Sequence, residues 1–95
     1  MINPKQRSYL KSIAHNLDPL LIIGKGGVTE NTIEQLNDLL NKRELVKLKI
    51  LDNNLDNREE MIEKILNELN CDFVQFIGSK LTIYRQSEEK KIELP

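Results

Sequence analysis

The chain of 95 residues has no tryptophan, one cysteine and one histidine, and this scarcity argues against several kinds of functional site. Cys71 has no partner for an internal disulfide bond, and the Cys and His ligands that a structural zinc site needs are missing. His15 has no second histidine, cysteine or paired acid near it in the sequence, which argues against catalysis at this residue. We therefore expect no metal, no cofactor and no enzymatic activity.

The sequence also lacks a signal peptide and any long apolar run. Its apolar stretches are far shorter than the roughly 20 residues that a helix needs to cross a bilayer. We therefore expect a cytoplasmic protein that does not contact a membrane.

A large excess of charge of either sign is absent as well, since the net charge is −1. The distribution is uneven: residues 1–49 hold eight Lys and Arg against five Asp and Glu, whereas residues 50–95 hold six against ten. Because salt screens charges beyond about 10 Å, a local basic patch in the first half can attract phosphate despite the neutral total.

The length suits one small core, so we predict a single domain over residues 1–95 with a charged tail at 86–95. Apolar spacing and turn residues predict the order helix, strand, helix, strand, helix, strand, strand. This order predicts an α/β fold in which helices pack on a four-stranded mixed sheet. The predicted helices are 4–16, 30–42 and one capped by Asp56 or Asn57 that ends near Asn70, and the predicted strands are 20–23, 45–51, 71–77 and 80–85.

A glycine-rich loop, Gly24-Lys25-Gly26-Gly27, follows the first predicted strand and precedes the second helix. Glycine lets another backbone approach closely, and the loop brings together amide groups, a helix N-terminus and the Lys25 ammonium. This combination attracts phosphate. The loop matches neither the phosphate-binding loop of nucleotide hydrolases nor the dinucleotide fingerprint, and taken alone it is more typical of a tight turn than of a phosphate site.

Two further sets of basic residues are regularly spaced. Arg7 and Lys11 lie four residues apart on the first helix, with His15 four residues further on. Lys47 and Lys49 lie on one face of the strand 45–51 together with Leu45 and Leu51, whereas Val46, Leu48 and Ile50 lie on the other. Each set is also typical of a solvated surface.

The residues in this order resemble a known family, the CRM-domain RNA-binding proteins of the bacterial YhbY type. The resemblance covers nearly the whole chain and depends on the motifs together rather than on any one of them. The matching motifs are Lys5-Gln6-Arg7, Leu10-Lys11, Ala14-His15, Pro19, Gly24-Lys25-Gly26-Gly27-Val28-Thr29-Glu30, Glu44-Leu45-Val46-Lys47-Leu48-Lys49-Ile50, Gln75-Phe76-Ile77-Gly78-Ser79-Lys80-Leu81, Tyr84-Arg85 and Lys91-Ile92-Glu93-Leu94-Pro95.

The resemblance implies a fold similar to the C-terminal domain of bacterial translation initiation factor three. It also implies a monomeric RNA-binding protein that associates with rRNA in precursors of the large ribosomal subunit, contacts ribosomal proteins and assists assembly. The family's GxxG loop corresponds to residues 24–27, where it grips the phosphate backbone. The predicted RNA-binding residues are Gly24, Lys25, Gly26, Gly27, Arg7, Lys11, Lys47, Lys49, Lys80 and Arg85.

Two other functions remain open from the sequence. The third helix carries Glu59, Glu63 and Glu68, and such an acidic face is compatible with a protein–protein adaptor on the ribosome. The glycine loop is compatible with a mononucleotide-binding domain, although the Lys-Ser/Thr pair and the magnesium-binding acid of such domains are missing.

Overall fold

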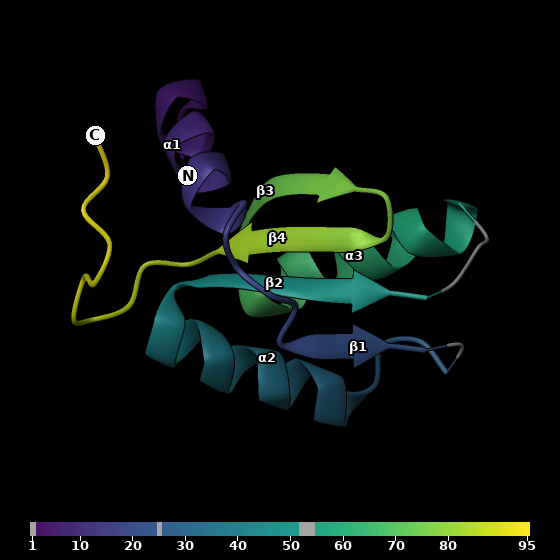
Figure 1. The fold of residues 1–95 in the computed structure, drawn as a ribbon. Helices are drawn as coiled ribbons and strands as arrows, with labels where there is room; N and C mark the ends of the chain where they lie inside the picture. Colours follow the sequence, from purple (N-terminus) through teal and green to yellow (C-terminus); the bar gives the residue numbers. More distant parts are fainter. Residues whose placement is uncertain (1, 25, 52–54) are drawn as a thin grey trace.

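A computed structural model describes residues 2–24, 26–51 and 55–95, the last range without the side chains of residues 55 and 56. Figure 1 shows three helices around a twisted sheet of four strands. This order of elements confirms the predicted α-β-α-β-α-β-β fold. The elements are α1 (Pro4–Ala14), β1 (Leu21–Ile23), α2 (Glu30–Arg43), β2 (Leu45–Ile50), α3 (Leu55–Leu69), β3 (Asp72–Ile77) and β4 (Lys80–Tyr84).

The strands lie in the order β1-β2-β4-β3. β1 pairs with β2 in parallel, and β4 pairs antiparallel with both β2 and β3. The predicted hairpin between β3 and β4 is confirmed, and its turn contains Gly78 at a φ of 63°, which favours glycine. β4 is inserted between β2 and β3, so these two strands run in the same direction without pairing.

Two helices begin at the capping residues that the sequence predicts. The Asn3 side chain accepts the amide of Gln6 at 2.8 Å, and the Thr29 hydroxyl accepts the amide of Thr32 at 3.2 Å. The predicted start of α3 is wrong: this helix begins at Leu55, so Asp56 and Asn57, which we expected to cap it, lie inside its first turn.

The two faces of the sheet are covered differently. α2 and α3 pack on one face and enclose the larger core, to which β2 contributes Val46, Leu48 and Ile50 as its alternation predicts. α1 packs on the opposite face, where a smaller core includes Leu10, Ala14, Leu45, Val74 and Tyr84. No helix in the described residues is long and apolar enough to cross a membrane.

The linker from α1 to β1 crosses the face of the sheet opposite α3 (Figure 1). Lys47 lies beneath this crossing and donates from Nζ to the carbonyl oxygens of Ala14 and Leu17, at 3.1 and 3.2 Å. A cation at this position complements the C-terminal end of α1. α1 and its linker therefore cover one half of this face, and the half nearer the glycine loop stays open.

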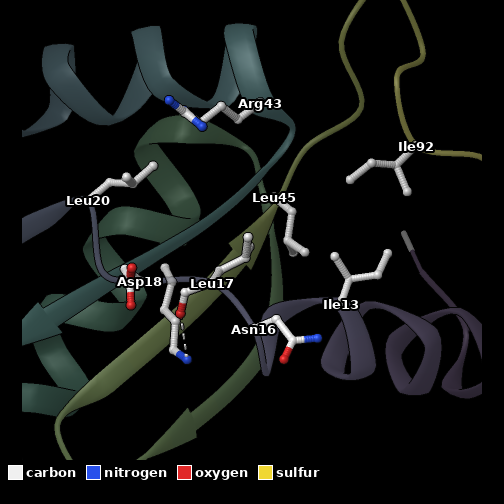
Figure 2. Close-up of a pocket in the computed structure, with 9 residues that line it drawn as sticks. Ile13, Asn16, Leu17, Asp18, Leu20, Arg43, Leu45 and Ile92 are labelled. Carbon is white, nitrogen blue, oxygen red and sulfur yellow. Dashed lines mark hydrogen bonds between the residues drawn. The ribbon is translucent and has the colours of Figure 1, made fainter.

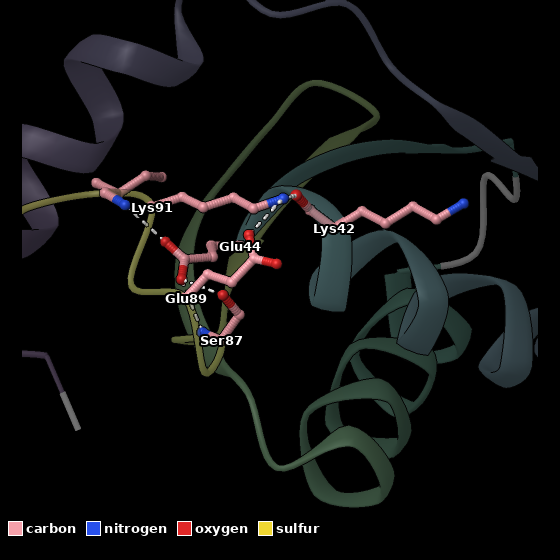
Figure 3. A network of polar contacts seen from close by, with 6 residues as sticks. Lys42, Glu44, Ser87, Glu89 and Lys91 are labelled. Carbon is pink, nitrogen blue, oxygen red and sulfur yellow. Dashed lines mark hydrogen bonds and ion pairs between the residues drawn. The ribbon is translucent and has the colours of Figure 1, made fainter.

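The tail after β4 is held by a buried carboxylate. Glu44 follows α2 at a φ of 66°, and its carboxylate accepts the amide of Ser87 at 2.8 Å, the hydroxyl of Ser87 at 2.6 Å and the amide of Ile92 at 2.7 Å. Figure 3 shows these contacts beside Lys91, which donates to the carbonyl of Lys42 and pairs with Glu89 at 3.6 Å. Burial raises the pKa of Glu44, but the hydrogen bonds outweigh burial and hold the pKa below its ordinary value.

Candidate nucleic-acid interface

The open half of the sheet face ends in a row of four neighbouring residues, one from each strand. Ile22 is in register with Lys49, Lys49 with Lys80, and Lys80 with Ile77. Residues in register share one face of a sheet, so these four side chains form one continuous surface, which we call the lysine row. Its two isoleucines are 62% and 67% exposed, which is unusual for side chains of this size.

The positions of the two lysines in this row lower the stability of the fold. Lys49 and Lys80 are directly opposite each other on antiparallel strands, where like charges repel. In the part of the chain that the structure describes, neither lysine forms an ion pair or a side-chain hydrogen bond. The uncompensated repulsion is relieved when an anion lies between them.

The glycine loop is at the same end of the sheet as the lysine row. Leu51 donates its amide to Ile23, and Ile50 donates to Ser79 of the β3–β4 turn, so the ends of β1 and β2 and this turn are adjacent. The loop itself closes as a turn in which the amide of Gly27 donates to the carbonyl of Gly24 at 3.1 Å. The prediction for Lys25 lies outside the described residues.

Only one of the described loop glycines is required by its backbone conformation. Gly27 has a φ of 74°, whereas Gly24 and Gly26 are outside the left-handed region, and a Cβ at either would meet no atom within 4 Å. Glycine at these two positions leaves the main chain uncovered towards solvent, which permits close approach by a ligand backbone.

The N-terminus of α2, which follows the loop, is already neutralised. Thr29 and Thr32 form a reciprocal cap, and Glu30 lies in the first turn, where a carboxylate complements the helix dipole. The positive potential at this end of the sheet therefore comes mainly from lysine side chains.

Arg7 and Lys11 of α1 line a groove beside the edge strand β3. The groove has a volume of about 500 Å³ and extends along β3 as far as Ile77, the last member of the lysine row. The Nε of Arg7 donates to the carbonyl of Phe73 at 3.2 Å, which holds its guanidinium at the groove. The structure thus places Arg7, Lys11, Lys49 and Lys80 along one connected surface.

Lys47 and Arg85, also predicted to bind RNA, have structural partners. The ammonium of Lys47 holds the carbonyls at the end of α1, beside a pocket of about 510 Å³ at the covered end of the sheet. Figure 2 shows this pocket between Ile13 of α1 and Arg43 of α2. Arg85 reaches the helices on the other face, and its guanidinium donates to the Leu69 carbonyl at 2.9 Å, to the Asn37 carbonyl and side chain, and to the Asn41 side chain.

The acidic helix α3 is on the face of the sheet opposite the lysine row. Glu59, Glu63 and Glu68 are all exposed there. The sheet thus separates these glutamates from the lysine row, and because salt screens distant charges, the field at the lysine row depends mainly on the charges close to it.

Ile22 and Ile77 of the lysine row are not among the RNA-binding residues predicted from the sequence. Their signal is the alternation of side chains in short strands, but it becomes informative only when the register of all four strands is known.

The structure also bears on metal binding and on the reactivity of the cysteine. In the described residues, no group of three or more His, Cys, Asp or Glu could hold a metal ion. Burial raises the pKa of Cys71 to about 11, so the thiol is protonated and weakly nucleophilic at neutral pH.

Comparison with known proteins agrees with this architecture. The solution structure of the hypothetical protein SAV1595 from Staphylococcus aureus, described as a candidate RNA-binding protein, matches with a TM-score of 0.85 and 49% identity, over all of both chains. The "Probable RNA-binding protein YqeI" of Bacillus subtilis (strain 168) is 38% identical over all of both chains. An "RNA-binding protein" of Haemophilus influenzae is 37% identical over 99% of this chain and 95% of its own length.

The model of the CRS1 / YhbY (CRM) domain matches residues 2–85. Full-length relatives and a closely similar structure accompany this match, and they confirm the resemblance seen in the sequence. The chain belongs to the CRS1 / YhbY (CRM) domain family.

Proposed function

We propose that this protein binds RNA through the open half of its sheet face, with the phosphate backbone lying on the lysine row and against the glycine loop. The single observation that carries this proposal is the unpaired Lys49–Lys80 juxtaposition. It repels within the free protein, and a phosphate group relieves the repulsion. The names of the relatives, which describe RNA-binding proteins, support the same ligand class.

The remaining parts of the interface have separate roles. Gly24 and Gly26 let the RNA backbone approach the main chain, and Lys25 adds charge at the same place. Arg7 and Lys11 extend the surface along β3. Such contacts position RNA without reading its sequence. We leave Lys47 and Arg85 out of the interface because their donors hold the protein together.

We further propose that the client is rRNA in precursors of the large ribosomal subunit, bound by a monomer in the cytoplasm. This part of the proposal rests on the family resemblance. The exposed glutamates of α3 are free to face ribosomal proteins while the opposite face holds RNA, so the adaptor function is compatible with RNA binding. A catalytic role is not part of the proposal.

The decisive experiment measures RNA affinity and particle association of the same variants. Lys49→Glu together with Lys80→Glu should weaken binding to rRNA fragments at least tenfold, because two phosphate contacts become repulsive. In a sucrose gradient of cell extract, the wild-type protein should migrate with large-subunit precursors and the double variant should remain at the top.

The matched control is Lys42→Glu with Lys64→Glu, which changes the net charge equally on exposed residues of α2 and α3. This control variant should bind rRNA fragments with wild-type affinity and migrate with large-subunit precursors. Equal losses in the two double variants would show that total charge rather than the lysine row governs binding. If the wild-type protein binds rRNA fragments but migrates only at the top of the gradient, RNA binding is supported and the ribosomal precursor is rejected as the client.

A further inference from the structure

The groove between α1 and β3 contains chemistry that phosphate binding alone does not use. Arg7 and Lys11 line it on the helix side, and residues 73–77 line it on the strand side. No acidic side chain is among these lining residues. The groove is therefore suited to an anionic ligand.

Gln75 lies in the middle of this strand segment and is half-buried. Among the described residues its amide has no hydrogen-bond partner, so a donor and an acceptor remain available side by side. Ile77, which shares this face of β3 with Gln75, is 67% exposed. The groove thus combines cations, apolar surface and a free amide, which are the groups that recognise an unstacked base and its phosphate.

An extended peptide fits the groove less well. β3 is an edge strand, and strand addition would need a regular row of free backbone groups along it. The pairing register shifts between Phe73 and Gln75, and the Phe73 carbonyl already accepts Arg7. Only the short segment 75–77 keeps a regular edge, which is too little for a stable added strand.

The aromatic ring of Phe76 serves the fold instead. It packs against the larger core, and the guanidinium of Arg58 lies 5.7 Å from its centre. Phe73 is in register with Ile83 of the larger core, so it shares the face of α2 and α3. The exposed apolar side chain on the groove side of β3 is therefore Ile77. Ile77 also belongs to the lysine row, so an RNA strand that lies on Lys80 leads directly into the groove.

We propose that the groove between α1 and β3 holds one unpaired nucleotide of the bound RNA. Arg7 and Lys11 contact its phosphate, Ile77 covers its base, and the amide of Gln75 donates to and accepts from the base edge. This inference rests on the proposed RNA-binding function and deepens it, because it assigns a substrate class: RNA with an unpaired segment next to a duplex. The groove volume of about 500 Å³ is in the range of small-ligand sites.

The test compares two RNA probes by fluorescence anisotropy. One probe is a blunt-ended hairpin, and the other is the same hairpin with five unpaired nucleotides at its 3′ end. The wild-type protein should bind the second probe about tenfold more tightly, since one recognised base adds that much affinity. Gln75→Leu, which keeps the side-chain size, should remove most of this preference and leave affinity for the blunt hairpin unchanged.

Controls separate the groove from the general interface. Gln35→Leu on the exposed face of α2 should keep the preference, and Lys49→Gln should weaken binding of both probes alike. Lys11→Gln, at an exposed position without a described partner, should reduce the preference even if Gln75→Leu fails to fold.

Each outcome has a distinct meaning. Equal wild-type affinity for the two probes, or a preference that survives both Gln75→Leu and Lys11→Gln, would overturn the nucleotide site and leave the proposed function intact. Failure to bind either probe would instead reject the proposed function. Binding of a labelled glutamate-rich peptide that Gln75→Leu abolishes would show a protein-binding groove and overturn the inference as well.

Discussion

At the residue scale, the lysine row combines a loss of stability with a proposed gain in binding. Lys49 and Lys80 face each other across antiparallel strands, and opposite-charge pairs at such positions stabilise whereas like charges destabilise. The local sequence thus departs from what the fold alone favours, and such departures are expected at functional sites.

Lys49→Glu should therefore stabilise the protein while weakening RNA binding. The new Glu–Lys pair should raise the free energy of unfolding by roughly 0.5 kcal/mol, measured by urea denaturation at low salt. Lys80→Glu should behave in the same way. Combining the two substitutions restores a like-charge pair and should cancel the gain. A decrease in stability for both single variants would contradict the repulsion.

The glycine loop gives a second prediction at this scale. Gly27→Ala should destabilise the fold by about 1–2 kcal/mol because a φ of 74° is strained for alanine. Gly24→Ala should change stability by less than about 0.5 kcal/mol, since its Cβ meets no neighbour, and should reduce RNA affinity. Thermal unfolding and anisotropy measurements on both variants check this. If Gly24→Ala keeps its full affinity, close approach of RNA at this glycine is rejected.

At the element scale, Arg85 connects β4 to both helices on the larger core. Its guanidinium bonds the C-terminal carbonyl of α3 at Leu69 and two asparagines one turn apart on α2, Asn37 and Asn41. Arg85→Met keeps the stem of the side chain and removes these bonds. We expect a loss of about 2 kcal/mol of unfolding free energy, measured by urea denaturation, with RNA affinity retained in the folded fraction. A variant with wild-type stability and weak RNA binding would show that Arg85 contacts RNA after all.

Docking of the tail, a second structural element, depends on the protonation state of Glu44. Because hydrogen bonds hold the pKa of Glu44 below its ordinary value of 4.5, the carboxylate stabilises the docked tail at neutral pH. This contribution is present above pH 4.5 and is lost as the pH falls through the lower folded-state pKa. We expect the amide of Ile92 to lose protection from hydrogen exchange below pH 4.5 before the sheet unfolds.

Glu44→Gln provides the control for this titration. Its tail should be more weakly docked at neutral pH and should show little further change on acidification. If the variant still shows the wild-type acid transition, a carboxylate other than Glu44 is responsible.

The sequence predicts the helices and strands well, but it does not predict which residues of different elements contact each other. Alternation in 45–51 and the caps at Asn3 and Thr29 follow from local chemistry, and the structure confirms them. The opposition of Lys49 and Lys80 depends on β4 pairing with β2, which local patterns do not encode. Likewise, the charge of Arg85 is visible in the sequence, but its asparagine partners come from a distant helix.

At the scale of the whole molecule, the basic surface proposed to bind RNA is separated from the glutamates of α3. The lysine row and the groove lie on one face, and the exposed glutamates of α3 lie on the other. The net charge of −1 therefore underestimates the attraction of RNA to one side of the protein.

Salt dependence should report the basic face rather than the total charge. Log affinity should fall linearly with log salt concentration, with a slope that reflects the number of phosphates neutralised. Lys49→Gln should reduce this slope by about one, and Lys42→Gln on the opposite face should leave it unchanged. Affinity that does not depend on salt would contradict an interface built on phosphate contacts.

The position of β4 has a consequence for the order in which the chain can fold. β4 is synthesised after the other three strands of the sheet, yet it lies inside the sheet, between β2 and β3. Before residues 80–84 emerge from the ribosome, β3 has no strand to pair with, and only the short β1–β2 ladder is available. Folding of this sheet during translation should therefore wait until residues 80–84 have left the exit tunnel.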